Sequence, residues 1–381
     1  MKRDILKLSV KKQVVNCIIL LCAVSYAYSQ DLKVVNIDGK GCTGEFPFII
    51  SNSNPLASEK INTYLNVDLL EIVPGSFKKC PFEKVMYDSA NCCAHTDFEN
   101  YSININSKTI LSISINGETT GAYSENANWN YNFNAITGDL IYPDELFTEA
   151  GYSKIKKQLI SKRKAIVTEF LKGLNAQFIS KKFEIDEERA NDQKSIYEDC
   201  LQYIDDNDFI YGQFLIHKNF IVFTRERCSN HGMRAVDDLG EFSDTLKISE
   251  ISNLLSRYGK ALLFEDTKEC QNIKPPISNT KILKGFINDK IPITCIFYRP
   301  YDDRSISIKY WYDKNKSVIE WRGTFRNKSK LNLIEDDYFD KKQDKWILKA
   351  LINADVTADS IKGTWTNQKN GKKLTICLNR Y

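Results

Sequence analysis

Three histidines, eleven cysteines and several acidic pairs are the side chains in this sequence most able to do chemistry. His95, His217 and His231 provide few candidates for a general base. The sequence contains no Gly-x-Ser-x-Gly, His-Glu-x-x-His, Walker or Gly-x-Gly-x-x-Gly motif. We therefore predict no catalytic residue and no cofactor.

Two short clusters combine thiols with imidazole, Cys92-Cys93-x-His95 and Cys228-x-x-His231. Four such ligands would suit zinc, and Cys228 with His231 could form a nucleophilic dyad. Adjacent cysteines chelate poorly, however, and an exported chain favours disulfides. We predict no metal site and a structural or oxidised Cys228.

Acidic pairs and tryptophans raise the question of a sugar site. A glycosidase needs two carboxylates that face each other across a cleft, whereas adjacent aspartates in polar turns are typical of solvated loops. Tryptophan rings could stack on sugars from a β surface, although Trp129 lies on an apolar strand face that predicts a core position. The acidic pairs are Asp205-Asp206, Asp237-Asp238, Asp302-Asp303 and Asp336-Asp337, and the other tryptophans are Trp311, Trp321, Trp346 and Trp365.

The first 29 residues resemble a secretory signal. A basic start precedes the short apolar run Val14–Val24, and Ala27-Tyr28-Ser29 is a small-x-small cleavage site before Gln30. The alternative is a membrane anchor, but the run falls well short of the roughly 20 residues that span a bilayer. We expect an exported chain, periplasmic or extracellular, with no stable membrane span once it is processed.

Export predicts disulfides among the nine cysteines that follow the signal. Cys80 lies about a dozen residues before Cys92 and Cys93, so we predict a bond from Cys80 to one of them, and Cys42 could take the other. Nine is an odd number, which leaves at least one thiol unpaired within the chain.

The net charge excludes two classes of protein. The formal charge is +4. Residues 1–29 carry five basic side chains and one acidic, which also gives +4, so the processed chain is neutral. A nucleic-acid binder or a polybasic membrane anchor needs an excess of basic residues.

Alternation and periodicity divide the chain into two regions. Residues 30–266 combine alternating strands around 101–106, 111–116 and 128–134 with helical patterns at about 57–69, 153–176, 186–203 and 248–258, and with a hairpin at 209–223. Strands and helices are segregated, so we predict an α+β domain with an antiparallel sheet and packed helices. Residues 267–281, which include Pro275-Pro276, are predicted to be a linker, and 282–381 an all-β, barrel-like domain of short strands.

Several motifs within residues 30–266, which we call region one, resemble the PdaC/RsiV-like extracytoplasmic domain. They are Phe46-Pro47, Leu111-Ser112-Ile113, Gly121-Ala122-Tyr123, Asn132-Phe133-Asn134, Thr137-Gly138-Asp139 and Leu146-Phe147. The family pattern has His where this chain has Tyr123. The resemblance implies an extracytoplasmic α+β recognition domain, followed here by a small envelope-type β-barrel.

Two functions from different classes follow. The first is a noncatalytic cell-envelope protein that binds a glycan, such as peptidoglycan, or a protein, such as lysozyme. The second is a cell-wall hydrolase with an unrecognised active site. We expect contact at Gly121, Ala122 and Tyr123, because glycine allows close backbone approach and Tyr123 offers a ring with a polar tip. The alternative is that Gly121 only permits a tight turn and Tyr123 packs locally.

Overall fold

The computed structural model describes most of the chain after the N-terminal segment. The described residues are 32–37, 42, 44–86, 95–121, 123–182, 186–204, 213–225, 227–273, 280–298, 305–327, 329–340, 345–357 and 359–381. The signal prediction for residues 1–29 lies outside them. In the part of the chain that is described, no helix is both long enough and apolar enough to cross a bilayer.

Region one begins with a two-stranded sheet and a helix, and a three-stranded antiparallel sheet packs on that helix. The first elements are β1 (Lys33–Asn36), β2 (Pro47–Ile50), α2 (Pro55–Leu69), β3 (His95–Asn106), β4 (Ile110–Thr120) and β5 (Ser124–Asn134). The sheet has the order β3-β4-β5. Its apolar side, including Ile113, Ile115 and Phe133, shares a core with Ile61 and Tyr64 of α2. The alternation of the sequence therefore predicts the core face correctly, but the opposite face is exposed only in part, because Ser112, Asn132 and Asn134 on it are also buried.

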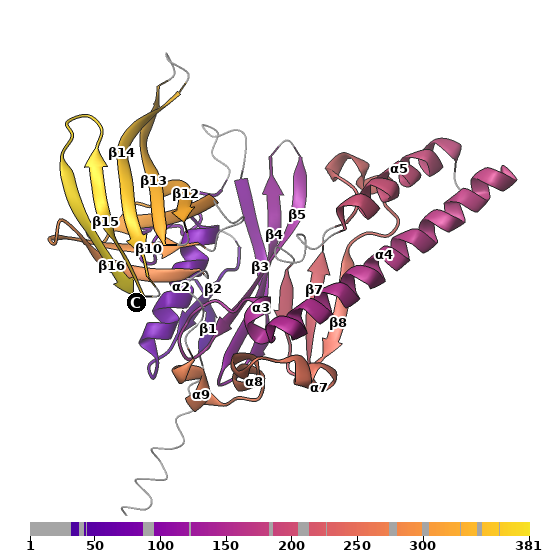
Figure 1. Cartoon of the computed structure of the whole chain (residues 1–381), viewed down its shortest axis with the longest axis horizontal. Coiled ribbons are helices and arrows are strands. Elements are labelled where there is room, and N and C mark those ends of the chain that lie inside the picture. The colour runs from indigo at the N-terminus through magenta and orange to yellow at the C-terminus, as the bar shows by residue number, and fades with distance from the viewer. Residues whose placement is uncertain are drawn as a thin grey trace, which may run out of the picture.

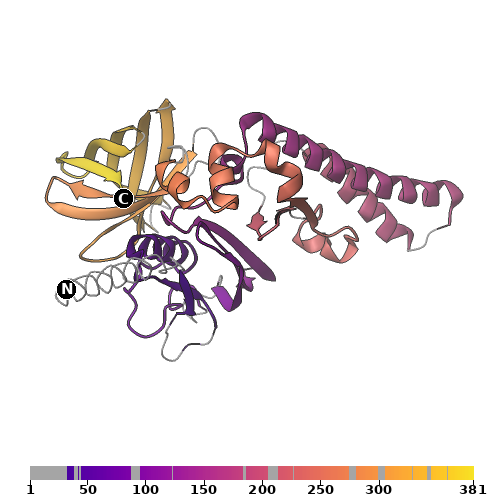
Figure 2. The same ribbon diagram turned by 90° about the horizontal axis from the view of Figure 1, so that it is seen from below.

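A long helical arm and a second small sheet follow. The elements are α3 (Pro143–Leu146), α4 (Glu149–Ser180), α5 (Glu187–Tyr203), β6 (Phe214–Ile216), β7 (Phe220–Arg225), the 3₁₀ helix η1 (His231–Val236) and β8 (Phe242–Lys247). The hairpin predicted at 209–223 corresponds to the β6–β7 pair, and its turn includes His217, Lys218 and Asn219. Figures 1 and 2 show α4 and α5 side by side, extending away from the C-terminal strands.

The helix expected at 248–258 is broken into shorter pieces. They are α7 (Ile248–Ile251), η2 (Ser252–Leu254) and α8 (Arg257–Leu263), followed by α9 (Thr267–Asn272) within the segment predicted as a linker. Ser256 separates α8 from η2, and its hydroxyl accepts a hydrogen bond from the Gly259 amide, as a helix N-cap does. Ser256 therefore starts a new helix, α8, within the segment that the apolar periodicity predicts as a single helix.

Residues 281–380 form a closed antiparallel barrel of eight strands, which confirms the predicted all-β architecture. The strands are β9 (Lys281–Ile287), β10 (Ile291–Phe297), β11 (Ser305–Tyr312), β12 (Ile319–Asn327), β13 (Lys330–Asp340), β14 (Lys345–Val356), β15 (Ser360–Asn367) and β16 (Lys373–Arg380). Each strand pairs with the next, and β16 closes the barrel on β9. The sequence pattern predicts the first strand of this region at Ile291–Tyr298, so β9 is a further strand that the pattern does not predict.

The barrel packs against α2 through buried charges. The turn Thr137–Asp139 docks on α2, where a Cβ on Gly138, whose φ is +73°, would lie 2.7 Å from the Ala57 carbonyl oxygen. Asp139 then accepts a bond from Lys60 Nζ at 2.9 Å and lies 3.5 Å from Arg380 Nη2 of β16. The Lys60 and Asp139 side chains are only 5% and 8% exposed. One carboxylate thus connects the turn, the helix and the barrel.

Replacing Asp139 with alanine should lower the free energy of unfolding by about 3–5 kcal/mol, because Lys60 would remain buried without its partner. Chemical denaturation measures this loss. The control is Asp355→Ala, which removes an exposed pair with Lys330 and should cost about 0.2–1 kcal/mol. Equal effects of the two substitutions would contradict the role assigned to Asp139.

Candidate functional site

The exposed half of the β3-β4-β5 sheet carries rows of polar side chains on the face opposite the core. The rows are Asn100, Asn116 and Asn128; then Asp97, Glu118 and Asn126; then His95, Thr120 and Ser124, each with one residue from every strand in register. Alternate residues of a strand point to opposite faces, which places these three rows together. Figure 1 shows the β4–β5 hairpin end projecting away from α8 and α9. We call this surface the polar face.

Hydrogen bonds hold the amides of the polar face in place. Asn128 donates to the Oδ1 atom of Asn116 at 2.5 Å, and Asn116 donates to the Oδ1 atom of Asn100 at 2.8 Å. A primary amide has two N–H donors and an oxygen with two lone pairs, so one bond on each side uses only part of its capacity. The row is therefore an ordered set of donors and acceptors on an exposed surface.

Carboxylates and hydroxyls occupy the rows nearer the hairpin end. Asp97 of β3 lies directly opposite Glu118 of β4, and His95 Nε2 is 3.3 Å from Asp97 Oδ2. Two like charges opposite each other weaken a sheet unless something neutralises or hydrogen-bonds them. The Thr120 and Ser124 hydroxyls are 2.9 Å apart. The polar face thus combines strong acceptors with hydroxyls that can both donate and accept.

A glycine brings β3 close to β4 at this point. A Cβ on Gly117 would lie 2.3 Å from the Asp97 carbonyl oxygen. The pairing of β3 with β4 shifts register between Phe98 and Asn100, which is the mark of a β-bulge. Gly117 therefore permits the bulged strand to approach and present Asp97.

Tyr123 lies at the end of the β4–β5 hairpin with one side of its ring covered. The residue is 67% exposed, and its ring stacks on His231 with centroids 4.7 Å apart. His231 Nδ1 contacts a carboxylate oxygen of Glu125, and Arg234 Nη2 lies 3.1 Å from the other oxygen. A ring supported on one side in this way is preordered for contact on the other. The alternative considered from the sequence, that Tyr123 packs locally, holds for the side of the ring that stacks on His231.

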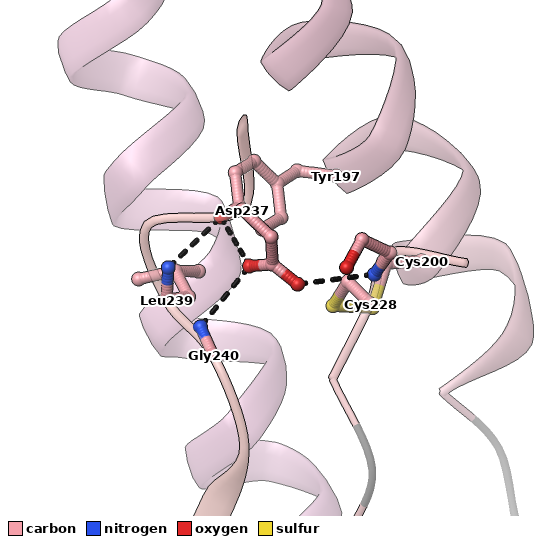
Figure 3. The surroundings of a disulfide bond; sticks show 7 residues. Tyr197, Cys200, Cys228, Asp237, Leu239 and Gly240 are labelled. Atoms are coloured by element: carbon pink, nitrogen blue, oxygen red, sulfur yellow. Dashed lines mark hydrogen bonds between the residues drawn. A yellow bond between two sulfur atoms is a disulfide. The ribbon is translucent and has the colours of Figure 1, made fainter. Parts of the chain in front are cut away.

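The loop that carries His231 and Arg234 is fixed by a disulfide and a buried aspartate. Cys228 is bonded to Cys200 of α5, with Cα atoms 5.3 Å apart (Figure 3). Asp237 accepts bonds from the Tyr197 hydroxyl at 2.7 Å and from the Ser229 and Gly240 amides at 3.1 and 3.0 Å. Burial raises the pKa of Asp237, but these hydrogen bonds outweigh it and hold the pKa below its ordinary value.

The structure places the other predicted site residues as follows. Gly121 is exposed, and no described atom would approach a Cβ there within 4 Å, so close packing does not explain this glycine. Ala122, Cys92 and Cys93 lie outside the described residues, so the predicted bond from Cys80 stays a prediction. Cys42 and Cys80 form no disulfide with another described residue. The Cys200–Cys228 bond was not predicted, although Cys228 is structural as expected.

The three histidines do not converge. His231 is at the hairpin end, His95 lies on the polar face at the start of β3, and His217 stacks on Phe220 in the β6–β7 turn with centroids 4.4 Å apart. Burial lowers the pKa of His217. His217 and His231 therefore lie at different places in the fold and do not share one carboxylate.

Most tryptophans of the barrel have buried side chains. Glu335 Oε2 accepts bonds from the Tyr310 hydroxyl and from the indole nitrogens of Trp321 and Trp365, each at 2.9 Å. Lys349 Nζ lies 2.7 Å from the other oxygen. A fully buried carboxylate needs such partners. Trp321 and Trp365 therefore do not form a sugar-stacking surface, and of the barrel tryptophans only Trp346 is well exposed, at 56%.

Comparison with solved structures finds five similar chains. No protein-family model matches the chain, and no curated protein matches it. The crystal structure of a member of the DUF3298 family from Bacteroides fragilis NCTC 9343 aligns with 15% sequence identity and a TM-score of 0.34. The alignment covers 59% of this chain and 92% of that chain. A likeness at this TM-score carries no conclusion about function.

Replacing both Cys200 and Cys228 with serine should lower the free energy of unfolding by about 2–4 kcal/mol, because the bond closes a loop across 28 residues of sequence. Thermal or chemical denaturation measures the change. Cys377→Ser, at a partly exposed thiol outside any described disulfide, is the control and should have little effect. An unchanged midpoint in the double variant would argue against the bond.

Proposed function

We propose that this chain is a noncatalytic, exported cell-envelope protein that binds a glycan through the polar face and Tyr123. Two observations support the proposal: the three in-register rows of amide, carboxylate and hydroxyl groups, and the supported aromatic ring of Tyr123 at the end of the same hairpin. Sugars present hydroxyl donors and acceptors at their edges and apolar C–H groups on their faces. Amides and carboxylates match the first, and an aromatic ring matches the second.

The polar side chains and the Tyr123 ring are held in place before a ligand binds. The Asn100–Asn116–Asn128 bonds fix the amides, while the disulfide and Asp237 fix the loop that supports Tyr123. Ordering these groups before the ligand arrives lowers the entropy cost of binding. Peptidoglycan is the envelope glycan with which the proposal is tested first, and lysozyme is the protein alternative.

Tyr123→Ala should weaken binding of the purified chain to peptidoglycan about fivefold to tenfold, because it removes an aromatic contact while leaving the strands intact. Sedimentation with insoluble peptidoglycan measures bound protein, and a denaturation midpoint confirms folding. Phe264→Ala is the matched control, since Phe264 is 57% exposed and follows α8, away from the hairpin end.

Three outcomes would contradict this proposal. Unchanged binding by Tyr123→Ala would remove Tyr123 from the site. Binding to lysozyme without binding to peptidoglycan would replace the glycan with a protein partner. Release of sugars or acetate from peptidoglycan by the purified chain would overturn the noncatalytic assignment and favour a hydrolase.

The exported location is supported by the basic start, short apolar run and small-x-small site of residues 1–29. Fractionation of the native host, followed by N-terminal sequencing, should recover the chain outside the cytoplasm with Gln30 as its first residue. Recovery from the cytoplasm with Met1 intact would contradict export.

A further inference from the structure

Three sulfur atoms lie together where the segment between α2 and β3 meets the chain that precedes β2. Cys80 Sγ donates a hydrogen bond to Met86 Sδ at 3.8 Å. Burial, and then a hydrogen bond with the Cys80 thiol, raise the pKa of Cys42 to about 11. The group therefore consists of two neighbouring thiols and a thioether, and we call it the sulfur cluster.

A tight turn and a glycine bring the sulfur cluster together. The Met86 amide donates to the Phe82 carbonyl at 2.9 Å, which closes a turn in the chain between Cys80 and Met86. A Cβ on Gly44 would lie 3.6 Å from Phe82 Cε2, so the chain that carries Cys42 passes against the same turn. Two segments that are far apart in the sequence thus present their sulfur atoms to each other.

The sulfur cluster has an apolar side and a side that solvent reaches. Cys80 is 8% exposed and belongs to the same core as Phe82 and Phe98, whose ring centroids are 5.7 Å apart. Cys42 and Met86 are half-buried. An ion can therefore reach the cluster from solvent at Cys42 and Met86, whereas hard ions such as Mg²⁺ and Ca²⁺, which require oxygen ligands, are disfavoured there.

We propose that the sulfur cluster binds Cu(I), with Cys42, Cys80 and Met86 as its three ligands. Thiolate and thioether sulfurs are soft ligands, and soft ligands select Cu(I) over hard cations. Structural zinc takes four ligands in a tetrahedron, drawn from thiolates, imidazoles and carboxylates, and a thioether is not among them. The thioether therefore separates this site from the cysteine–histidine clusters considered from the sequence.

The spacing of the sulfur atoms fits a single ion. A metal–thiolate bond is about 2.3 Å long in zinc proteins, and three sulfurs in a plane around one ion at that distance lie about 4.0 Å apart. The Cys80 and Met86 sulfurs are 3.8 Å apart. Binding transfers the protons of the two thiols to water and changes the oxidation state of neither copper nor sulfur, so no oxidant or reductant takes part.

The competing fate of the two thiols is a disulfide. Cys42 and Cys80 are both free thiols among the described residues. A bond between them would require the sulfurs to approach to about 2.05 Å and would require an acceptor for two electrons and two protons. Copper binding and disulfide formation therefore exclude each other at this pair, which allows one to be tested against the other.

Titration with Cu(I), supplied as its coloured complex with bathocuproine disulfonate, tests the proposal on the full chain. The chain is isolated without reductant and handled without oxygen, so that the Cys200–Cys228 bond stays intact. Loss of the colour should show that each chain withdraws one Cu(I) ion. An excess of Zn²⁺ should not displace that ion.

Variants of the ligands show which sulfurs hold the ion. Met86→Leu nearly conserves volume and should weaken Cu(I) binding at least tenfold, since even the outer partners of a metal ligand are worth about that much. Cys80→Ser should abolish the uptake. Met233→Leu, at a methionine of η1 outside the cluster, is the matched control and should bind Cu(I) like the unchanged chain. A denaturation midpoint confirms that each variant is folded.

Three results would overturn the copper site. They are no uptake of Cu(I) by the unchanged chain, unchanged affinity in a folded Met86→Leu variant, and a disulfide from Cys80 to Cys42, Cys92 or Cys93. Mass spectrometry of peptides from the native host's protein, prepared without reductant, detects such a bond. The polar face is not part of the sulfur cluster, so none of these results bears on glycan binding.

Discussion

The buried carboxylate of Asp139 is the interaction on which the arrangement of the described structure depends. It lies in the turn that follows β5, and it contacts Lys60 of α2 and Arg380 of the last barrel strand. Three segments far apart in the sequence therefore meet at one charge. Because Lys60 and Arg380 are themselves largely buried, removing Asp139 leaves their charges uncompensated in a poorly solvated place.

The barrel and the first sheet share more than this charge. Ile282, Ile296 and Trp311 of the barrel belong to the same hydrophobic core as Phe133 of β5 and Leu65 of α2. The sheet thus has one face committed to a core that includes the barrel, which leaves the polar face as its free surface near the hairpin end. The separation of the two faces follows from the strict alternation of apolar and polar residues along β4 and β5.

Fold class and much of the secondary structure could be predicted from sequence because each element has a strong local period. α5 begins at Glu187, close to the predicted residue 186, and the alternation around 128–134 marks β5. The sequence does not predict β9 because its residues, KILKGFI, lack a strict alternation of apolar and polar side chains, and it extends the helix at 248–258 across the cap at Ser256. Barrel closure between β9 and β16 depends on contacts about 90 residues apart, which no local period reveals.

The candidate site was only partly accessible to the same reasoning. Tyr123 was identified from a motif, but its support by His231 depends on a loop held by the Cys200–Cys228 bond, and disulfide pairing cannot be deduced from cysteine spacing alone. The asparagines of β5 predict only that one face of the strand is exposed to solvent. Their assembly with Asn100 and Asn116 into a row requires the register of three strands.

The central claim is that a glycan is bound on the polar face of the first sheet, and hydrogen–deuterium exchange tests it most directly. Exchange of the full chain is followed with and without a saturating soluble fragment of peptidoglycan. The account predicts slower amide exchange in β3, β4 and β5 and in the η1 loop, with the barrel strands unchanged. Protection confined to β9–β16 would place the ligand on the barrel and contradict the account.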